Sequence, residues 1–452
     1  MLDHAGEEQW QDVIRLVIGH CNRRETEAVI SGLVAAGDTT GERETRFALR
    51  ALAVECAMSA GALEDSRHDE VWEKLRAMGA PCTEQEVLHL ASLGPDALAV
   101  IPEPEGLRPA DAVGYVQVLR LLGDAGLSRL ARYGRLDARE VRAEIVASWP
   151  YLDTPQFAEQ VLAGMRLDDM GVRVFRRSQL VQLPRLGHID RLLISGDCDA
   201  ESLRTALRGC TMRQLSLVRN NALADLGLLR DHPEIEELSI HRCLMVKDLS
   251  ALAGLNLTAL DVTDHRLRFT ALTVLPSLAG LRTLWLDPLA EGDGRFPDLP
   301  PGLEHLTVVS SDALRLDSLA PLPNLKSLFL YAELAGSRAL QHVRGRPHLT
   351  ELGLWETTLS ELDDRDCLPG IRRLVLDVIK PVLAPDLRRY FPGLRKVHIM
   401  DRRHDVEQAL DLTALQGEPA LEIEVDNPTG QPTVLDPHHF GDRLTINGQP
   451  AA

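Results

Sequence analysis

Aromatic residues and lysines are scarce in this chain. Trp, Tyr and Phe together make up only 4% of its 452 residues. Lysine supplies five of the 49 cationic side chains, at positions 74, 247, 326, 380 and 396, and none of them lies in a Gly-rich stretch. A Walker-type phosphate loop needs its lysine directly after a run of glycines. The sequence therefore contains no such loop, which excludes ATP hydrolysis of the P-loop type.

Long apolar runs are missing as well. No stretch approaches the roughly 20 apolar residues that cross a bilayer. The N-terminal segment MLDHAGEEQW carries acidic residues where a secretory signal has basic ones. We therefore expect a cytoplasmic protein without a membrane partner.

The chain has no excess of positive charge. Its 67 acidic residues outnumber 49 basic ones and give a net charge of −18. Nonspecific binding to nucleic acid starts from a basic surface. No nucleic-acid partner is expected.

Several motifs of metal and covalent chemistry are also absent. The seven cysteines, an odd number, include no Cys-x-x-Cys pair and no histidine neighbour at metal-ligand spacing. We interpret them as reduced core thiols. Because Gly-x-Ser-x-Gly and His-Glu-x-x-His are missing too, we expect neither an enzyme nor a cofactor. The cysteines stand at positions 21, 56, 82, 198, 210, 243 and 367.

One apolar phrase recurs ten times, as Leu-x-x-Leu-x-Leu in its ideal form. The phrases begin at Ile189 and end at Ile399, and successive ones start 22 to 24 residues apart. This period lies in the leucine-rich-repeat range, in which each repeat supplies one short strand. The phrases start at positions 189, 212, 235, 257, 281, 303, 325, 349, 371 and 394. After each strand, a polar or Cys side chain is expected to satisfy the turn, as at Asn220, Cys243 and His265, whereas Leu289 and Ile379 predict irregular turns.

The first part of the chain has apolar residues at helical spacing instead. Helices are expected near 24–36, 42–60, 67–79, 84–93, 109–123, 137–148 and 155–165, besides one around Trp10 to Ile18. Thr83 with Glu86 predicts a capping box, and Thr154 before Pro155 predicts a helix start. We therefore predict an α+β repeat protein in which an all-α domain precedes a leucine-rich-repeat solenoid. The expected divisions are a helical bundle or HEAT-like domain at 1–165, a junction and N-terminal cap at 166–188, the solenoid at 189–426, and a C-terminal cap with a frayed tail at 427–452.

The residues between the buried leucines predict the binding surface. Pleating sends them to the concave face, where aromatic residues concentrate between Trp285 and Trp355. Exposed aromatic clusters with a polar rim usually mark an interface. We predict a protein ligand of basic or amphipathic character, bound by the aromatic residues Trp285, Phe329, Tyr331 and Trp355 and by the rim residues Asp261, Asp287, Glu351, Asp377, His305 and His398.

Two alternatives stay open at this point. The N-terminal helices, or another segment of the chain, could fold over the aromatic rings. The chain could instead be a metal-dependent hydrolase that uses a His/Asp-rich C-terminal region with the repeats as substrate receptor; that region is His438, His439, Asp436 and Asp442. The oligomeric state is not predicted by any pattern.

The N-terminal stretch EEQWQDVIRLVIGHCNRRETEAVISGLV resembles the helical region that follows the nucleotide-binding module in bacterial NACHT proteins of the STAND class. The likeness lies in Trp10, Val13, Ile14, Leu16, Gly19 and His20. In that family, an ATPase motor is followed by helices and a leucine-rich sensor. The resemblance implies a sensor role in bacterial defence. Because the phosphate loop is missing, it does not imply motor activity, and the chain looks like a motorless relative.

Overall fold

The computed structural model describes residues 4–59, 65–152, 155–289, 296–310, 312–316, 319, 322–334, 339–359, 362, 366–379, 387–403, 409–427 and 434–451. The chain divides into two compact units. The first comprises Met1–Arg191 with Thr205–Thr211, and the second comprises Leu192–Arg204 with Met212–Ala452.

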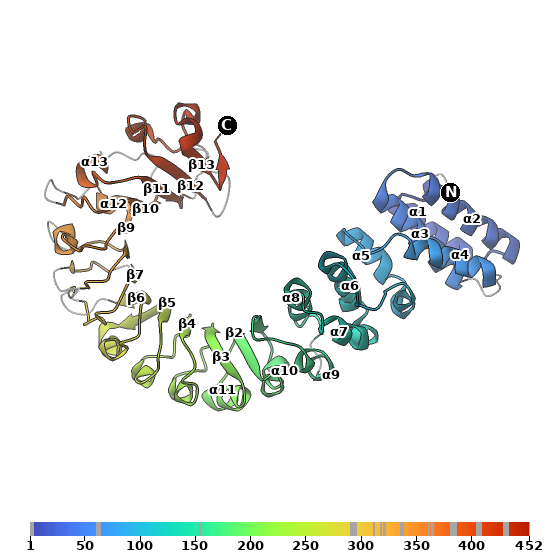
Figure 1. Cartoon of the computed structure of the whole chain (residues 1–452), viewed down its shortest axis with the longest axis horizontal. Helices are drawn as coiled ribbons and strands as arrows, with labels where there is room; N and C mark the ends of the chain where they lie inside the picture. Colours follow the sequence, from blue (N-terminus) through green and yellow to red (C-terminus); the bar gives the residue numbers. More distant parts are fainter. Residues whose placement is uncertain are drawn as a thin grey trace. The chain divides into compact units, whose positions relative to one another are not determined.

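The first unit is mainly helical (Figure 1). Its α-helices are α1 (Glu8–Ile18), α2 (Arg23–Thr39), α3 (Arg43–Ser59), α4 (Asp65–Arg76), α5 (Glu84–Ala91), α6 (Pro109–Leu121), α7 (Leu127–Tyr133), α8 (Arg139–Ala147), α9 (Pro155–Gln160) and α10 (Arg177–Leu180). Short 3₁₀ turns η2 (Gly94–Ala99), η3 (Gly123–Gly126), η4 (Leu162–Gly164) and η5 (Leu183–Arg185) connect several of them. The helices predicted from apolar spacing are present, and α7 is one that the spacing did not indicate.

Each helix of this unit packs against neighbours in the sequence. α2 contacts α3, α3 contacts α4 and α5, α5 contacts α6, and α6 contacts α8. The largest side chains in the core are fully buried, among them Phe47, Tyr133, Trp149 and Phe157. Burial of a large apolar side chain contributes roughly 1.5–3 kcal/mol, so these packed faces hold the short helices together.

The helix starts differ in part from the expected capping. At α5, the Thr83 hydroxyl accepts a bond from the Glu86 amide at 3.2 Å, as predicted. The buried Glu86 carboxylate does not complete the box. It accepts from the Cys82 amide at 2.7 Å and from Arg43 Nε at 2.9 Å, because α3 brings a guanidinium beside it. A full capping box occurs at α2, between Asn22 and Glu25. Thr154 lies outside the described residues.

Among the described residues, fourteen strands form one sheet in chain order. Figure 1 shows strands of this sheet following one another along the chain. The pairs from β3 to β13 are parallel, and β13 and β14 are antiparallel. The strands are β1 (Gly171–Val174), β2 (His188–Ser195), β3 (Thr211–Val218), β4 (Glu237–His241), β5 (Ala259–Arg268), β6 (Thr283–Leu289), β7 (His305–Val309), β8 (Ser327–Tyr331), β9 (Glu351–Trp355), β10 (Arg373–Val378), β11 (Lys396–Asp401), β12 (Glu422–Asp426), β13 (Leu444–Ile446) and β14 (Gln449–Pro450).

Short helical turns run between the strands. They are α11 (Ala200–Leu207), η6 (Gly227–Asp231), η7 (Ser250–Leu252), η8 (Phe269–Leu272), η9 (Leu275–Ser277), η11 (Ala339–Val343), α12 (Glu356–Leu359), α13 (Leu387–Tyr390), η12 (Thr413–Leu415), η13 (Pro437–His439) and η14 (Gly441–Arg443). The alternation of one short strand and one helical turn fits an α+β repeat protein of the leucine-rich type.

Every apolar residue of the ten phrases is buried, from Ile189 to Ile399. The register aligns equivalent phrase positions across the sheet, as in the neighbouring series Leu328, Leu352 and Leu374. Each phrase therefore contributes its leucines to a continuous core. Alternation leaves the residues between them on the opposite face of the sheet, which we call the outward face.

The turns after the strands carry out the predicted polar role where they are described. Asn220 is buried, and its side chain accepts bonds from the amides of Cys198 and Leu223, both at 3.1 Å. Cys243 is buried with its thiol near the Leu217 carbonyl at 3.4 Å. Leu289, where an irregular turn was expected, is the last residue of β6 and pairs with Arg268, beyond a register shift between Val262 and Leu267 of β5. The His265 side chain lies outside the described residues.

The C-terminal stretch departs from the expected frayed tail. Its described residues include the hairpin of β13 and β14, β13 pairs with β12, and Phe440 and Leu444 are buried. Beyond the tenth phrase, β12 (Glu422–Asp426) adds a further parallel strand beside β11.

The thiols are only partly core residues. Cys56, Cys210 and Cys243 are buried, whereas Cys82 is exposed and the remaining three are intermediate. Burial raises the pKa of Cys56 to about 12 and that of Cys210 to about 11. Cys82 corrects the prediction, because it precedes α5 in a connecting segment and does not lie on an apolar face.

No helix in the described parts of the chain is both long and apolar enough to cross a membrane.

Candidate binding site on the outward face of the sheet

Seven predicted concave-face positions lie side by side on the outward face. The register pairs Asp261 with Trp285, Trp285 with Thr307, and Thr307 with Phe329. It continues from Phe329 through Gly353 and Val375 to His398. The aromatic residues therefore share one face of the second unit with most of the predicted rim.

The rings on this face are accessible to different degrees. Trp285 is 46% exposed, and Phe329, Tyr331 and Trp355 are partly exposed. Phe329 and Tyr331 stack with their planes 2° apart and their centroids 6.4 Å apart. The Phe329 ring also lies over Gly353, where an added Cβ would come within 2.1 Å of Phe329 Cδ1. Gly353 thus provides the space in which this ring sits.

Tyr331 and Trp355 line one pocket of about 390 Å³. The other lining residues are Val309, Thr357, Asp377, Ile379 and Arg402. The strand residues of the pocket come from β7 to β10, Thr357 lies in α12, and Ile379 and Arg402 directly follow β10 and β11. Two aromatic side chains and two aliphatic ones surround a single carboxylate and a single guanidinium. This combination of apolar walls and a few convergent polar groups is typical of a binding pocket.

Asp377 differs from the exposed rim residue that the sequence predicted. It is only 9% exposed. Its Oδ2 lies 2.8 Å from Arg402 Nε. Burial raises the pKa of the Asp377 carboxyl, although Arg402 acts in the opposite direction. The reason for the burial is position: Asp377 directly follows the apolar core of β10, and Trp355 is its partner on β9.

Tyr331 is electrostatically linked to the same carboxylate. Burial, together with the neighbouring Asp377 charge, raises the pKa of Tyr331 to about 12. The phenol therefore stays neutral at physiological pH and offers a hydroxyl and an aromatic face to a ligand.

Other predicted rim residues form a polar ladder across neighbouring strands. His305 Nδ1 lies 2.9 Å from Ser327 Oγ on β8, and Ser327 Oγ donates to Glu351 Oε2 on β9 at 3.1 Å. Since the hydroxyl has one hydrogen, His305 must donate from Nδ1. Arg373 Nη1 on β10 lies 4.0 Å from Glu351. These hydrogen bonds and the ion pair restrict the motion of the polar side chains, which would be freer if they were only hydrated.

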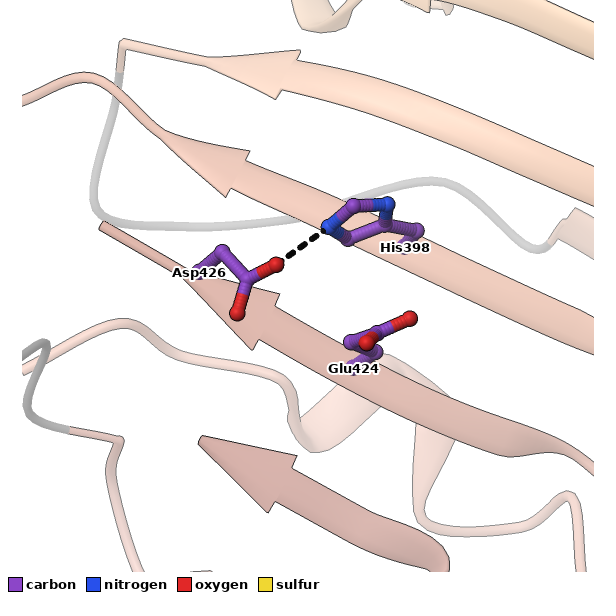
Figure 2. A group of neighbouring side chains, drawn as sticks. All are labelled: His398, Glu424 and Asp426. Carbon is purple, nitrogen blue, oxygen red and sulfur yellow. Dashed lines mark hydrogen bonds and ion pairs between the residues drawn. The ribbon is translucent and has the colours of Figure 1, made fainter. Parts of the chain in front are cut away.

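The ladder continues into a group on β11 and β12. Figure 2 shows His398 pointing toward Asp426, with Glu424 beside them. His398 Nε2 lies 2.8 Å from Asp426 Oδ2, and Arg373 Nη2 lies 3.5 Å from His398 Nδ1. Arg373 can only donate, so His398 carries its hydrogen on Nε2. Lys396 Nζ pairs with Glu424 Oε2 at 2.8 Å and lowers the pKa of that carboxyl.

His398, Glu424 and Asp426 are also the one group, among described residues, whose His, Cys or carboxylate ligand atoms converge enough to hold a metal ion. The ligand atoms lie within 4.8 Å of one another. However, Lys396 already binds Glu424, and the His398 nitrogen facing Asp426 carries a proton. The geometry is accounted for by hydrogen bonds and ion pairs within the chain.

The His/Asp-rich region near the C-terminus does not form such a group. His438 and His439 are exposed, and their rings lie 4.3 Å apart. His439 Nδ1 lies 3.2 Å from Gln416 Nε2. The four residues proposed for a hydrolase, which include Asp436 and Asp442, therefore do not come together as metal ligands in the described structure.

The outward face is strongly acidic. Eight carboxylates occupy the outward positions of β4 to β12: Glu237, Asp261, Asp287, Glu351, Asp377, Glu422, Glu424 and Asp426. Among the described side chains, three cationic residues share these positions: Arg268, Arg373 and Lys396. Some of the acids have partners on the sheet, as Asp261 has in His241 at 3.3 Å. The remaining excess of negative charge favours a basic ligand.

Besides Val309, which directly follows the last apolar residue of its phrase, the predicted binding residues omitted three residues of the pocket. They are Thr357, Ile379, which was expected only in an irregular turn, and Arg402. Each stands three residues after the last apolar residue of its phrase. The signal that was missed is the size of the Ile379 and Arg402 side chains. A tight turn does not need large side chains, and these two extend the wall of the pocket.

No protein-family model and no curated protein matches the chain. Among solved structures, an internalin from Listeria monocytogenes is similar, with a TM-score of 0.36 and 15% identity over 75% of this chain and 94% of that chain. Internalin C2 from the same species has a TM-score of 0.26 and 18% identity over 49% and 84%. A leucine-rich-repeat protein from Leptospira interrogans has a TM-score of 0.34 and 14% identity over 64% and 78%. Because these TM-scores are low, the assignment of a leucine-rich-repeat region rests on the ten phrases and the sheet they form.

Proposed function

We propose that this chain is a non-enzymatic recognition module that binds a protein ligand on the outward face of its sheet. One observation carries the proposal: Tyr331 and Trp355 line a pocket that also contains the nearly buried carboxylate of Asp377. Trp and Tyr are enriched among the residues that dominate interface energies. Trp285, which lies on the same face, would extend the contact to neighbouring repeats.

The ligand is proposed to be basic or amphipathic. Its apolar groups would contact the aromatic rings, and its cations would meet the acidic excess of the outward face. The predicted contacts remain Trp285, Phe329, Tyr331, Trp355, Asp261, Asp287, Glu351, Asp377, His305 and His398. Opposite charges of this kind mainly raise association rates and exclude wrong partners.

The wider assignment follows the N-terminal resemblance. We propose a cytoplasmic, motorless relative of NACHT-type defence sensors, in which residues 1–165 are a helical domain, 166–188 the junction, 189–426 the solenoid and 427–452 the C-terminal cap. The support is the likeness around Trp10 and Gly19 together with the order of helices and repeats. Identification of a separate NTPase among captured partners would test this role.

The test of ligand binding is affinity capture from the native host. The intact chain is compared with the double variant Tyr331→Ala, Trp355→Ala. Loss of the two rings should weaken capture by about 2 kcal/mol or more, the usual scale for interface hot spots. The core leucines of β8 and β9 are unchanged, so the repeats should keep their far-UV circular dichroism.

A matched control removes two exposed aromatic residues elsewhere. Tyr151→Ala, Phe175→Ala deletes rings of the first unit that are 73% and 49% exposed. Capture by this control should equal that of the intact chain. Equal capture by the intact chain and by the Tyr331, Trp355 variant would refute the assignment of the binding face.

A further inference from the structure

The pocket between β8 and β10 has the composition of a receptor for a planar cation. Tyr331 and Trp355 supply aromatic side chains, and Asp377 supplies a carboxylate within the same 390 Å³ space. A guanidinium is planar, stacks on aromatic faces and binds carboxylates through several N–H groups. A pocket of this kind therefore suits an arginine side chain better than an anion.

An arginine of this chain already makes part of that contact. Arg402 places Nε 2.8 Å from Asp377 Oδ2, yet its side chain remains 56% exposed. The carboxylate is nearly buried, whereas its cationic partner is largely in water. Because the Arg402 guanidinium keeps much of its contact with water, it can leave Asp377 when another cation takes its place on the carboxylate.

The charged residues of the outward face favour ligand groups of one charge over the other. Among the described side chains, eight carboxylates and three cationic residues occupy the outward positions of β4 to β12. A ligand carboxylate directed at Arg402 would approach through this acidic field, whereas a ligand guanidinium would be attracted by it.

We propose that this pocket receives an arginine side chain of the protein ligand, which replaces Arg402 on Asp377 and lies against Tyr331 and Trp355. The inference rests on the proposed function and adds the identity of the anchoring residue. Arg402 then acts as an internal competitor that occupies the carboxylate until the ligand binds.

Removal of Arg402 distinguishes the possible occupants by the sign of its effect. If a ligand cation replaces Arg402, Arg402→Gln tightens binding. If a ligand carboxylate pairs with Arg402, the same change weakens binding. If the occupant is a neutral apolar side chain, binding changes little. Arg395→Gln is the matched control, because it removes an exposed arginine at the other end of β11.

The experiment titrates the full chain with three blocked tripeptides, acetyl-Gly-Arg-Gly-amide and its lysine and citrulline counterparts. Binding is followed by the indole N–H signal of Trp355 in nuclear magnetic resonance, assigned with Trp355→Phe. The citrulline peptide, which has nearly the same shape and no charge, should bind about tenfold more weakly than the arginine peptide. The lysine peptide should fall between them, because its ammonium is not planar.

The variants complete the test. Arg402→Gln should bind the arginine peptide about threefold or more tightly, Asp377→Asn about tenfold more weakly, and Arg395→Gln as the intact chain does. Thermal unfolding verifies that each variant folds. Asp377→Asn removes a buried charge, and the cation that it leaves unpaired, Arg402, is exposed. The Asp377→Asn variant can therefore test the inference even if Arg402→Gln is unstable.

Equal binding of the arginine and citrulline peptides, or unchanged or weaker binding by Arg402→Gln, would overturn the inference. Failure of the inference is distinguishable from failure of the proposed function. If the chain captures its partner through Tyr331 and Trp355 but does not bind the arginine peptide, the proposed function is supported and the proposed arginine anchor is refuted. A chain that captures nothing loses the function whatever the peptides do.

Discussion

Gly353 is a glycine in the middle of a strand, where such a residue usually marks a close approach of another group. Its backbone is not in the left-handed region, so flexibility of φ is not the reason for it. The Phe329 ring occupies the volume that a side chain would need. Because Gly353 has no Cβ, the Phe329 ring can occupy this space while it stacks on Tyr331, beside the pocket.

Gly353→Ala should displace Phe329. The new Cβ would lie 2.1 Å from Phe329 Cδ1, and relief of such overpacking typically costs about 1–3 kcal/mol. Chemical unfolding measures the loss of stability, and the ring signals of Phe329 report its movement. Gly417→Ala is the control, because nothing lies within 4 Å of the position of its added Cβ. Equal stability of the two variants with unmoved Phe329 signals would contradict the packing described.

At the scale of the element, the last residue of β11, Asp401, forms a buried ion pair with Arg403 in the segment that follows. Asp401 is 0% exposed, and Arg403 is also buried. Arg403 Nε donates to Oδ1 and Nη2 donates to Oδ2 of Asp401, both at 2.8 Å. Burial alone would raise the pKa of Asp401, but the bonds from Arg403 outweigh it and lower the pKa below its usual value.

This pair should make stability depend on pH. An acid with a lowered folded-state pKa stabilises the fold above its unfolded pKa of about 3.9, and the contribution is lost as the pH falls through the folded value. Asp401→Asn leaves Arg403 buried without its counter-charge, which costs about 3–5 kcal/mol at neutral pH. Denaturant unfolding at pH 7, 5, 4 and 3 should show this deficit shrinking below pH 4. The exposed Asp442→Asn should show no deficit, and a constant deficit for Asp401→Asn at all four pH values would contradict the assignment.

The elements also show what a sequence can reveal. The strands were predictable because each phrase buries its leucines by the same alternation, repeat after repeat. The pocket was not, because it depends on how far Ile379 and Arg402 reach from turns after neighbouring strands. Asp377 was expected at a solvated rim for the same reason: alternation gives the face of the sheet but not the side chains that cover it. The ladder from His305 to Glu351 likewise depends on rotamers.

At the scale of the whole molecule, charge is the dominant property. The net charge of −18 and the acidic outward face act together on any basic partner that approaches. Fields of this sign increase the encounter rate, and salt screens them over about 8 Å at physiological ionic strength.

Association with the captured ligand should therefore slow as salt is added. Between 50 mM and 500 mM salt, the association rate constant should fall by about tenfold or more, with a smaller change in dissociation. Surface plasmon resonance with the purified partner measures both rates. Sucrose at matched osmolarity controls for effects of solute other than charge. An association rate that is independent of salt would show that the ligand is not recognised through its cations.

The edge strand of a parallel sheet built from similar repeats can pair with a strand of another copy of the protein. The β13–β14 hairpin interrupts that direction, since β14 runs antiparallel and comprises only Gln449 and Pro450. Proline has no amide hydrogen to offer to a further strand, and short proline-bearing edges resist strand addition. At this end of the described sheet, a further strand would therefore meet a short antiparallel strand that carries a proline.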